Sequence, residues 1–313
     1  MIKLNHQLPE SFFAEEAKTL IVSAETKRIW AVLLDLLLEF DGVCKRNGIR
    51  YFIDSGTLLG AVRHRGFIPW DDDLDVALLR EEYEKLCAVA PKEFRHPYFF
   101  QTNATDSGSA RGHAQLRNSL TTGILKSEMK DGKSIFQFNQ GMFLDIFPLD
   151  DVPDNQEELR LFRNDILLAK RKVSYTRSCV ADNGMSGIRQ FARRIKAEML
   201  ITPLRFKRNF FGKDMLTLAC ENFDYTLRKY CGLGMLKCAN MVLYPFAERK
   251  MFDRSVYNET AEYEFEGFRF PGPADYETVL RGYYGDWRRH VVGGSVHGGV
   301  FFDTDRPYTE YLK

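Results

Sequence analysis

The fold of this chain is decided by the stretch YFIDSGTLLGAVRHRGFIPWDDDLDVA, which spans residues 51–77. A short run rich in aromatic and β-branched residues predicts a strand. A serine–glycine–threonine turn follows and can cap a short helix. A loop with glycine and proline then leads into an acidic second strand. The predicted order is a strand over 49–53, a turn over 55–57, a helix over 58–63, a loop over 64–70 and a strand over 73–79.

The acidic run over 71–75 predicts a metal site within the second strand. Because side chains alternate along a strand, Asp73 and Asp75 are expected to share one face, with Leu74 and Val76 on the other. Carboxylates held this close repel each other. A divalent cation removes that repulsion, and oxygen ligands suit Mg²⁺ or Mn²⁺.

A third ligand is expected in the apolar stretch 141–147, where Asp145 is the charged residue. A charge in an apolar strand is costly unless it is paired or metal-bound. The alternatives for Asp145 are a helix cap or a buried salt bridge, and residue 145 taken alone fits these alternatives as well as it fits a metal ligand. Asp71 and Asp72 are interpreted as loop residues or as residues that support the ligands. The predicted catalytic and metal-binding set is Asp73, Asp75 and Asp145.

An anion-binding region is predicted just before the acidic strand. Backbone N–H groups at the start of a helix bind phosphate, and Gly56 would let a phosphate approach the main chain. The basic loop that follows supplies counter-charges for a negatively charged substrate, although a solvated surface loop has the same composition. The residues assigned to this region are Ser55, Gly56, Thr57, Arg63, His64 and Arg65.

Three more residues are candidates for donor contacts, and each has a plainer structural alternative. Trp70 can stack on a base or pack in the core. Arg117 can bind a phosphate or lie on the surface. His297, in a glycine-rich segment, can act as a base or a phosphate contact, or can be an exposed loop histidine.

Beyond the acidic region, strands flanked by helices without regular βαβ alternation predict an α+β fold. Apolar residues at helical spacing, with a glycine cap, predict a helix over 26–47. A helix from Glu81 is expected to end at Pro91, and a strand from Met142 to end at Pro148. The predicted divisions are an N-terminal arm over 1–25, a catalytic core over 26–155, a helical basic segment over 156–250 and a C-terminal segment over 251–313.

The overall composition is that of a soluble globular protein, with 44% apolar and 28% charged residues among 313. The six cysteines are scattered without metal-ligand spacing, which predicts reduced thiols. The first twenty residues lack the apolar core of a signal peptide. The longest apolar stretch, 29–40, is too short to span a bilayer. We therefore expect a cytoplasmic protein.

The middle of the chain is strongly basic. Residues 170–213 contain twelve Lys or Arg against Asp182 and Glu198, although the whole chain carries only +1. Apolar residues interleave with these charges, and a basic amphipathic helix is typical of a membrane surface. We hypothesise peripheral docking on anionic lipid at the inner face of the plasma membrane; the alternative is a solvated helix with a core-packing face. The segment has no nucleic-acid-binding motif, so a nucleic-acid partner is not expected.

Residues 51–77 resemble the signature of the LicD family, which includes phosphorylcholine transferases and is similar to the fukutin-related ribitol-phosphate transferases. The resemblance rests on GTLLGAVRH at 56–64 and GFIPWDDD at 66–73. It continues in LDIFPLD at 144–150 and, more weakly, in the C-terminal segment. There the matching pieces are FEGF at 265–268 and YYGDW at 283–287.

The resemblance implies a nucleotidyltransferase-like fold, a mixed sheet flanked by helices with an added helical segment. It implies a CDP-alcohol donor such as CDP-choline, whose phospho-alcohol moves to a hydroxyl of a cell-surface glycan or its lipid-linked precursor as CMP leaves. It places Asp73, Asp75 and Asp145 at the metal, and residues 55–57 with Arg63 at the donor phosphates. Many members continue the Tyr-Gly-Asp-Trp element with prolines, whereas RRHVVGG follows here, which predicts a differently shaped pocket.

Three rival functions share parts of this pattern. A nucleotidyltransferase that releases pyrophosphate would use the same carboxylates. A sugar transferase also binds metal and nucleotide through Asp-x-Asp, but the Gly-Thr turn and the Asp145 strand argue against it. A non-catalytic nucleotide-binding module would have a degenerate site, and the complete set of carboxylates argues against that.

Overall fold

The acidic run is anchored from behind by the first long helix, α1 (Ala24–Asn47). The Ser23 side chain accepts a hydrogen bond from the Thr26 N–H at one end of α1, and Gly48 takes a left-handed conformation at the other. The indole N–H of Trp30 donates to the carbonyl of Asp71 at 2.8 Å. The structure, a computed structural model, describes residues 3–13, 22–181, 187–208, 214–291 and 299–313.

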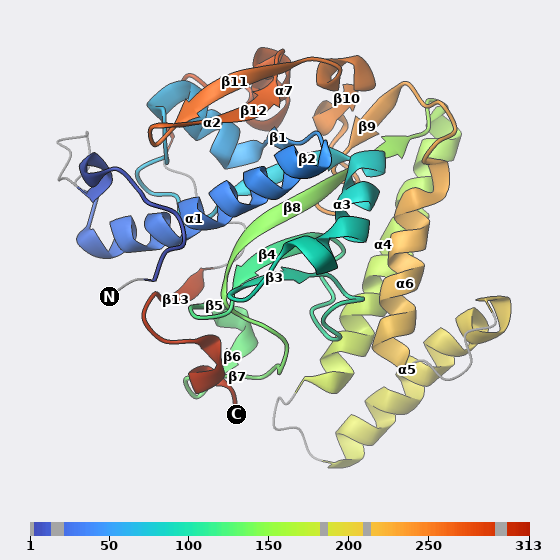
Figure 1. Ribbon diagram of the computed structural model, residues 1–313. Coiled ribbons are helices and arrows are strands. Elements are labelled where there is room, and N and C mark those ends of the chain that lie inside the picture. The colour runs from blue at the N-terminus through green and yellow to red at the C-terminus, as the bar shows by residue number, and fades with distance from the viewer. Residues whose placement is uncertain (1–2, 14–21, 182–186, 209–213, 292–298) are drawn as a thin grey trace.

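A mixed seven-stranded sheet positions the acidic residues (Figure 1). Its main path runs β1-β2-β8-β4-β3, and β9 and β10 extend the sheet beside the far end of β8. Strands β2 and β8 are parallel, whereas the other neighbouring pairs are antiparallel. The strands are β1 (Phe52–Ile53), β2 (Asp75–Leu79), β3 (Tyr98–Gln101), β4 (Ala114–Asn118), β8 (Met142–Val152), β9 (Lys237–Ala239) and β10 (Met251–Asp253).

Helices pack around this sheet and complete the main core. Helix α1 and helix α3 (Arg80–Glu93) contact β8 and each other, so they cover one face of the sheet (Figure 1). Helix α2 (Ser55–His64), which follows β1, packs against β2, against the hairpin strand β11 and against α7 (Tyr276–Tyr284). Segments far apart in sequence thus meet around the turn that precedes the acidic run.

Three helices form a second core beside the sheet: α4 (Gln156–Val180), α5 (Gly187–Arg208) and α6 (Met215–Leu227). Helices α4 and α6 lie alongside each other, and α5 crosses their lower end and projects outward (Figure 1). Among the described helices, none is both long and apolar enough to cross a bilayer.

The C-terminal part of the chain folds back onto the sheet region. The hairpin of β11 (Thr260–Phe265) and β12 (Phe268–Pro273) lies against β1, and β13 (Val300–Asp303) pairs with β5 (Thr122–Leu125). A short hairpin joins β6 (Met129–Lys130) to β7 (Lys133–Ser134). The remaining short elements are 3₁₀ helices at Glu10–Phe13, Lys126–Glu128, Arg228–Tyr230, Glu248–Lys250, Arg254–Tyr257 and Tyr308–Tyr311.

The architecture is α+β, a mixed sheet flanked by helices with an added helical segment, as the sequence predicted. Two boundaries predicted at prolines were wrong, and the predicted turn 55–57 is the first turn of α2. Strand β8 continues through Pro148 because pairing with β4 ends at Ile146 and pairing with β9 starts at Asp150, so that edge needs no N–H from the proline. Helix α3 includes Pro91 and ends at Glu93.

Candidate active site

Asp75 and Asp145 lie side by side, in register, on the parallel strands β2 and β8. The Asp75 N–H donates to the Thr57 hydroxyl at 2.8 Å, and the Asp145 N–H donates to the carbonyl of Leu74 at 3.0 Å. Asp145 is buried and Asp75 is half-buried. The rigid centre of the sheet therefore brings together two of the three predicted ligands, and Thr57, predicted as a donor contact, holds the start of β2.

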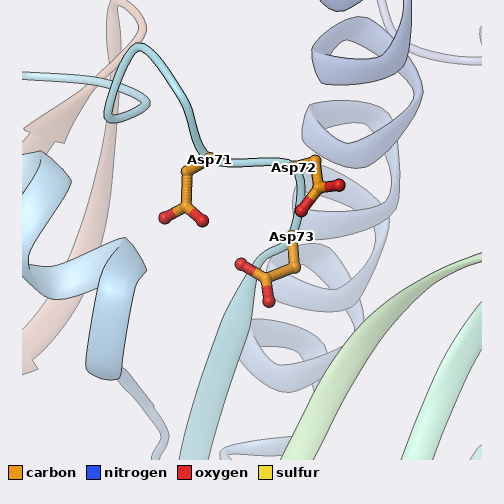
Figure 2. Close-up of side chains that lie close together, drawn as sticks. All are labelled: Asp71, Asp72 and Asp73. Atoms are coloured by element: carbon orange, nitrogen blue, oxygen red, sulfur yellow. The ribbon is translucent and has the colours of Figure 1, made fainter. Parts of the chain in front are cut away.

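The three aspartates that precede β2 gather at its start (Figure 2). One oxygen from each of Asp71, Asp72 and Asp73 lies within 4.8 Å of the others. Figure 2 shows the carboxylates of Asp71 and Asp73 directed toward one another. Because β2 begins at Asp75, Asp73 lies in the preceding loop and not on a strand face, which corrects the predicted alternation. Asp71 and Asp72, interpreted from the sequence as loop or supporting residues, lie in the loop beside Asp73.

The acidic residues raise one another's pKa values. Burial, followed by the charges of Asp73, Asp145, Asp54 and Asp71, raises the pKa of Asp75 well above its usual range. Burial and the neighbouring Asp73 raise the pKa of Asp71 to about 8. Like charges in a partly buried place disfavour ionisation. A divalent cation would relieve this repulsion, and an all-carboxylate donor set fits Mg²⁺ or Mn²⁺.

A chain of polar side chains orients Asp145 from the neighbouring strand β4. The Oδ1 atom of Asp145 accepts hydrogen bonds from His113 Nε2 at 3.0 Å and from Gln115 Nε2 at 2.6 Å. The guanidinium of Arg117 donates in turn to Gln115, to Gln101 at 2.6 Å and to the main-chain carbonyl of residue 141. Burial lowers the pKa of Arg117 to about 9. Fully buried Arg117 therefore supports Asp145 through Gln115, which differs from its predicted role as a phosphate ligand.

The first turn of α2 is strained and tightly packed. Ser55 has a φ of 48°, which is uncommon for a residue with a side chain. Its hydroxyl and that of Tyr283 donate to the buried carboxylate of Asp54 at 3.3 and 3.0 Å. A Cβ on Gly56 would lie 2.7 Å from Oδ2 of Asp71, so only glycine fits against that carboxylate. The predicted anion turn thus directly contacts the acidic run.

The predicted basic residues at the end of α2 reach the C-terminal segment. Arg63 is half-buried, and its Nη1 donates to the carbonyls of Trp287 at 3.2 Å and Arg289 at 3.4 Å. The ring of His64 lies 5.6 Å from that of His290. The segment in which the sequence departs from the family pattern therefore touches two predicted donor residues.

The remaining predicted donor contacts are placed as follows. Arg65 is the C-cap of α2 in a left-handed conformation, is exposed, and accepts the N–H of Glu266 through its carbonyl. Trp70 is half-buried against the main core, which is the plainer of its two alternatives. His297 lies outside the described residues.

Sequence reasoning missed a cation and tyrosines near the carboxylates. The Lys250 ammonium lies 3.3 Å from the ring centroid of Tyr244 and 5.0 Å from that of Tyr283. Burial and Arg249 lower the pKa of Lys250 to about 8, against the opposing effect of Asp54. Burial, then Asp75 and other carboxylates, raise the pKa of Tyr244 to about 12. No local pattern marks Lys250, because the long-range fold brings it to the site.

The sequence over residues 113–117 has a pattern that predicts a polar strand face. His113, Gln115 and Arg117 alternate with apolar Ala114 and Leu116, the period expected of a strand with one polar face. Reading that alternation would have predicted a polar strand face opposite Asp145.

The strand-turn-helix unit and the carboxylates on adjacent parallel strands all lie within one continuous region of the chain, residues 48–180. Residues 48–180 match the family described as LicD/FKTN/FKRP, nucleotidyltransferase domain, so this part of the chain is a LicD family domain. The matched residues include the turn, the acidic run and Asp145, and they extend past the predicted end of the core at residue 155 through α4.

Two relatives show how far the similarity reaches. The chain is 28% identical over 258 residues to the lipopolysaccharide cholinephosphotransferase LicD of Haemophilus influenzae, covering 82% of this chain and 89% of that protein. It is 46% identical over 41 residues to the human ribitol 5-phosphate transferase FKRP, covering 13% of this chain and 8% of that protein. The first similarity covers most of both chains, and the second is confined to a short segment.

Proposed function

We propose that this chain transfers a phospho-alcohol, phosphocholine from CDP-choline being the first candidate, to a hydroxyl of a cell-surface glycan or its lipid-linked precursor. The name of the Haemophilus influenzae relative, a cholinephosphotransferase, supports this donor chemistry. The observation that carries the proposal is the in-register pair Asp75 and Asp145 beside the Asp71–Asp73 cluster. Carboxylates concentrated in this way serve a cationic ligand better than they serve folding.

A divalent cation, Mg²⁺ or Mn²⁺, is part of the proposal. Asp73, Asp75 and Asp145 would hold it, and the proximity of Asp71 supports adding that residue to the set. The bound ion would supply charge neutralisation at the donor diphosphate. The support for an ion is the pKa of Asp75, which burial and the surrounding carboxylates raise.

The side chains themselves would bind and orient the reactants. The start of α2 presents N–H groups beside the acidic run, and these can donate to a phosphate. The half-buried Lys250 ammonium provides a positive charge near Asp54. The bonds from His113 and Gln115 hold Asp145 in one orientation. Preorganisation of this kind is the main protein contribution to phosphoryl transfer.

The proposed reaction is a single displacement at phosphorus. The acceptor hydroxyl oxygen forms a bond to the phosphorus of the phospho-alcohol while the bond to the CMP oxygen breaks. The hydroxyl proton passes to Asp75 or Asp145, and CMP departs with the electron pair of the broken bond. A carboxylate is a suitable proton acceptor when the attacking oxygen lies within hydrogen-bond reach.

The test is a panel of donors assayed for nucleotide release. Purified protein is incubated with CDP-choline, CDP-ethanolamine, CDP-glycerol or CDP-ribitol, with a glycan acceptor and with Mg²⁺, Mn²⁺ or a chelator. Metal-dependent release of CMP with one donor supports the proposal. Release of pyrophosphate from CTP supports the rival nucleotidyltransferase. Failure of calorimetry to detect Mg²⁺ or Mn²⁺ binding would favour a non-catalytic module.

The acceptor is proposed to be a membrane-linked glycan at the inner face of the plasma membrane, with the protein in peripheral contact with anionic lipid. The support is the basic composition of α5, which has seven Lys or Arg and one Glu within Gly187–Arg208. Fractionation of cells into soluble and membrane pools, with release from the membrane by high salt, tests this location.

A further inference from the structure

Helix α5 has two apolar faces, and only one of them is used by the fold. Ala197, Ile201 and Leu204 are buried in the second core, where α5 packs against α4 and α6. A second apolar stripe is formed by Ile188, Phe191, Ile195 and Met199, which recur at three- and four-residue spacing. At about 100° per residue, this stripe lies opposite the buried one.

The outer stripe is strongly exposed. Ile188 is 85% exposed, Phe191 66% and Met199 71%. A single exposed apolar residue needs no explanation, whereas a continuous stripe of large ones marks an interaction surface. The outer stripe of α5 is such a surface, because its residues lie in a row along one helix.

Basic side chains flank the outer stripe. Arg189, Arg193, Arg194 and Lys196 are all exposed, and Glu198 is the acidic residue of the helix. Arg189 and Lys196 lie on one side of the stripe and Arg194 on the other, by helical geometry. The surface therefore combines an apolar centre with a border that is basic on one side and carries Glu198 beside Arg194 on the other.

We propose that the outer stripe of α5 is a membrane-docking surface that inserts Ile188, Phe191, Ile195 and Met199 into the interface of an anionic bilayer. Arginine and lysine at the border pair with lipid phosphates and carboxylates, while the apolar centre enters the boundary between headgroups and acyl chains. This inference deepens the proposed function, since it rests on an acceptor presented at a membrane.

Charge complementarity selects lipid over a second copy of the chain. Two copies meeting through this helix would bring like-charged borders together and would be repelled. An anionic surface instead meets the basic residues that lie between Arg189 and Lys196. The helix also projects from the second core (Figure 1), so the stripe can lie flat on a surface without moving the sheet.

The experiment measures vesicle binding by the full chain in the absence of donor. Binding to vesicles with about 30 mol% phosphatidylserine is compared with binding to pure phosphatidylcholine at about 50 mM salt. The test variant is Phe191→Ser/Met199→Ser. The matched control is Leu161→Ser/Leu168→Ser, which removes two exposed leucines, 48% and 54% exposed, from the neighbouring helix α4.

Wild type and the α4 control are expected to bind the anionic vesicles, and the α5 variant to bind at least about tenfold more weakly. Replacing Arg189 and Arg194 by Gln should weaken binding roughly fivefold per residue at low salt. Circular dichroism and melting temperature identify any variant that has lost its fold. Equal binding by wild type and the α5 variant overturns the proposal, as does concentration-dependent dimerisation that the α5 variant abolishes without any vesicle binding by wild type.

The same samples are assayed for CMP release from the CDP-alcohol panel with a soluble acceptor. The α5 variant should retain this activity, because α5 lies in the second core and not beside the carboxylates. Vesicle binding without CMP release by wild type would contradict the proposed function and leave the docking surface standing. CMP release without vesicle binding would contradict the docking surface and support the proposed function.

Discussion

Two of the buried aspartates on strand β8, Asp145 and Asp150, have opposite surroundings. Asp150 faces a cation: the guanidinium Nε of Arg80, also buried, donates to its carboxylate at 2.7 Å. Asp145 instead faces Asp75 on the adjacent strand, with more aspartates just beyond. Asp145 lies beside Asp75 of β2, whereas Asp150 pairs with Arg80, the first residue of α3, which directly follows the end of β2.

The difference separates a charge that serves the fold from charges that serve a ligand. A buried ion pair is hydrogen-bonded within the protein, and removing one partner leaves an uncompensated charge. A group of like charges destabilises the folded state unless something cationic binds there. Proteins retain such destabilising arrangements where function requires them. Replacing Asp75 should therefore reduce activity and spare stability, whereas replacing Asp150 should reduce stability and spare activity.

Asp75→Asn is expected to give the largest effect, a loss of CMP release of about 10³-fold or more. Stability should not fall, because the amide removes a charge that the surrounding carboxylates repel. The measurements are CMP release with metal and the melting temperature in chelator. In addition, Mg²⁺ should raise the melting temperature of wild type and not of the variant.

The control for this prediction is Asp150→Asn, made further along the same strand, β8. It should lower the melting temperature and leave the turnover of the folded fraction nearly unchanged. If Asp75→Asn instead lowered stability and spared turnover, Asp75 would serve the fold and not a ligand.

Arg80→Met should produce the next largest effect, a loss of about 3–5 kcal/mol in the free energy of unfolding, because Asp150 would remain buried without its cation. Urea unfolding measures this loss. The double variant Arg80→Met/Asp150→Leu should recover much of it, since neither charge then remains. A double variant no more stable than the single one would show that the ion pair is not the cause.

The sequence was sufficient to predict the acidic strand and the residue opposite it. Asp145 was found because a charge in an apolar strand requires a partner, and β2 and β8 do place it beside Asp75. The alternation that put Asp73 on the strand face failed because pairing begins only at Asp75. Strand ends depend on pairing partners, which local pattern does not specify.

Residues that act through distant contacts could not be predicted in this way. Lys250 and Tyr244 come from a segment that folds back past the second core, and their proximity to Asp54 and Asp75 depends on tertiary packing. Arg117 was interpreted from its charge alone, as a phosphate ligand or a surface residue. Its complete burial follows from the polar face of β4, which meets Gln101 and Gln115.

Gln115→Met tests whether the orientation of Asp145 matters for activity, because it removes a hydrogen bond to Asp145 and keeps the side-chain length. We expect kcat to fall about 10–100-fold, the usual effect of losing a group that orients a metal ligand. The KM for the donor should change little. Gln101→Met is the control, since Gln101 contacts Arg117 and not Asp145 directly, and should reduce kcat less. A pure KM effect would instead place Gln115 in the donor pocket.

Glu128, like Asp150, is a buried carboxylate paired with arginine. Its replacement should give the smallest and most pH-dependent effect. It is buried and accepts hydrogen bonds from Arg111 at 3.1 Å and from Arg177, on α4, at 2.7 Å. Burial raises the pKa of its carboxyl, but the two arginines outweigh burial and hold the pKa below its ordinary value of 4.5. Glu128→Gln should therefore cost about 2 kcal/mol at neutral pH.

The pH dependence of that loss follows from the lowered pKa. Stability from the ionised Glu128 is fully present above the unfolded-state value near 4.5 and disappears as pH falls through the lower folded-state pKa. Urea unfolding of wild type and Glu128→Gln should thus differ most at neutral pH and converge in acid. A difference that is constant with pH would mean that shape, and not charge, holds this residue in place. Asp75→Asn should not lower the free energy of unfolding at neutral pH. The Asp75 carboxylate faces other carboxylates, whereas Glu128 faces two arginines.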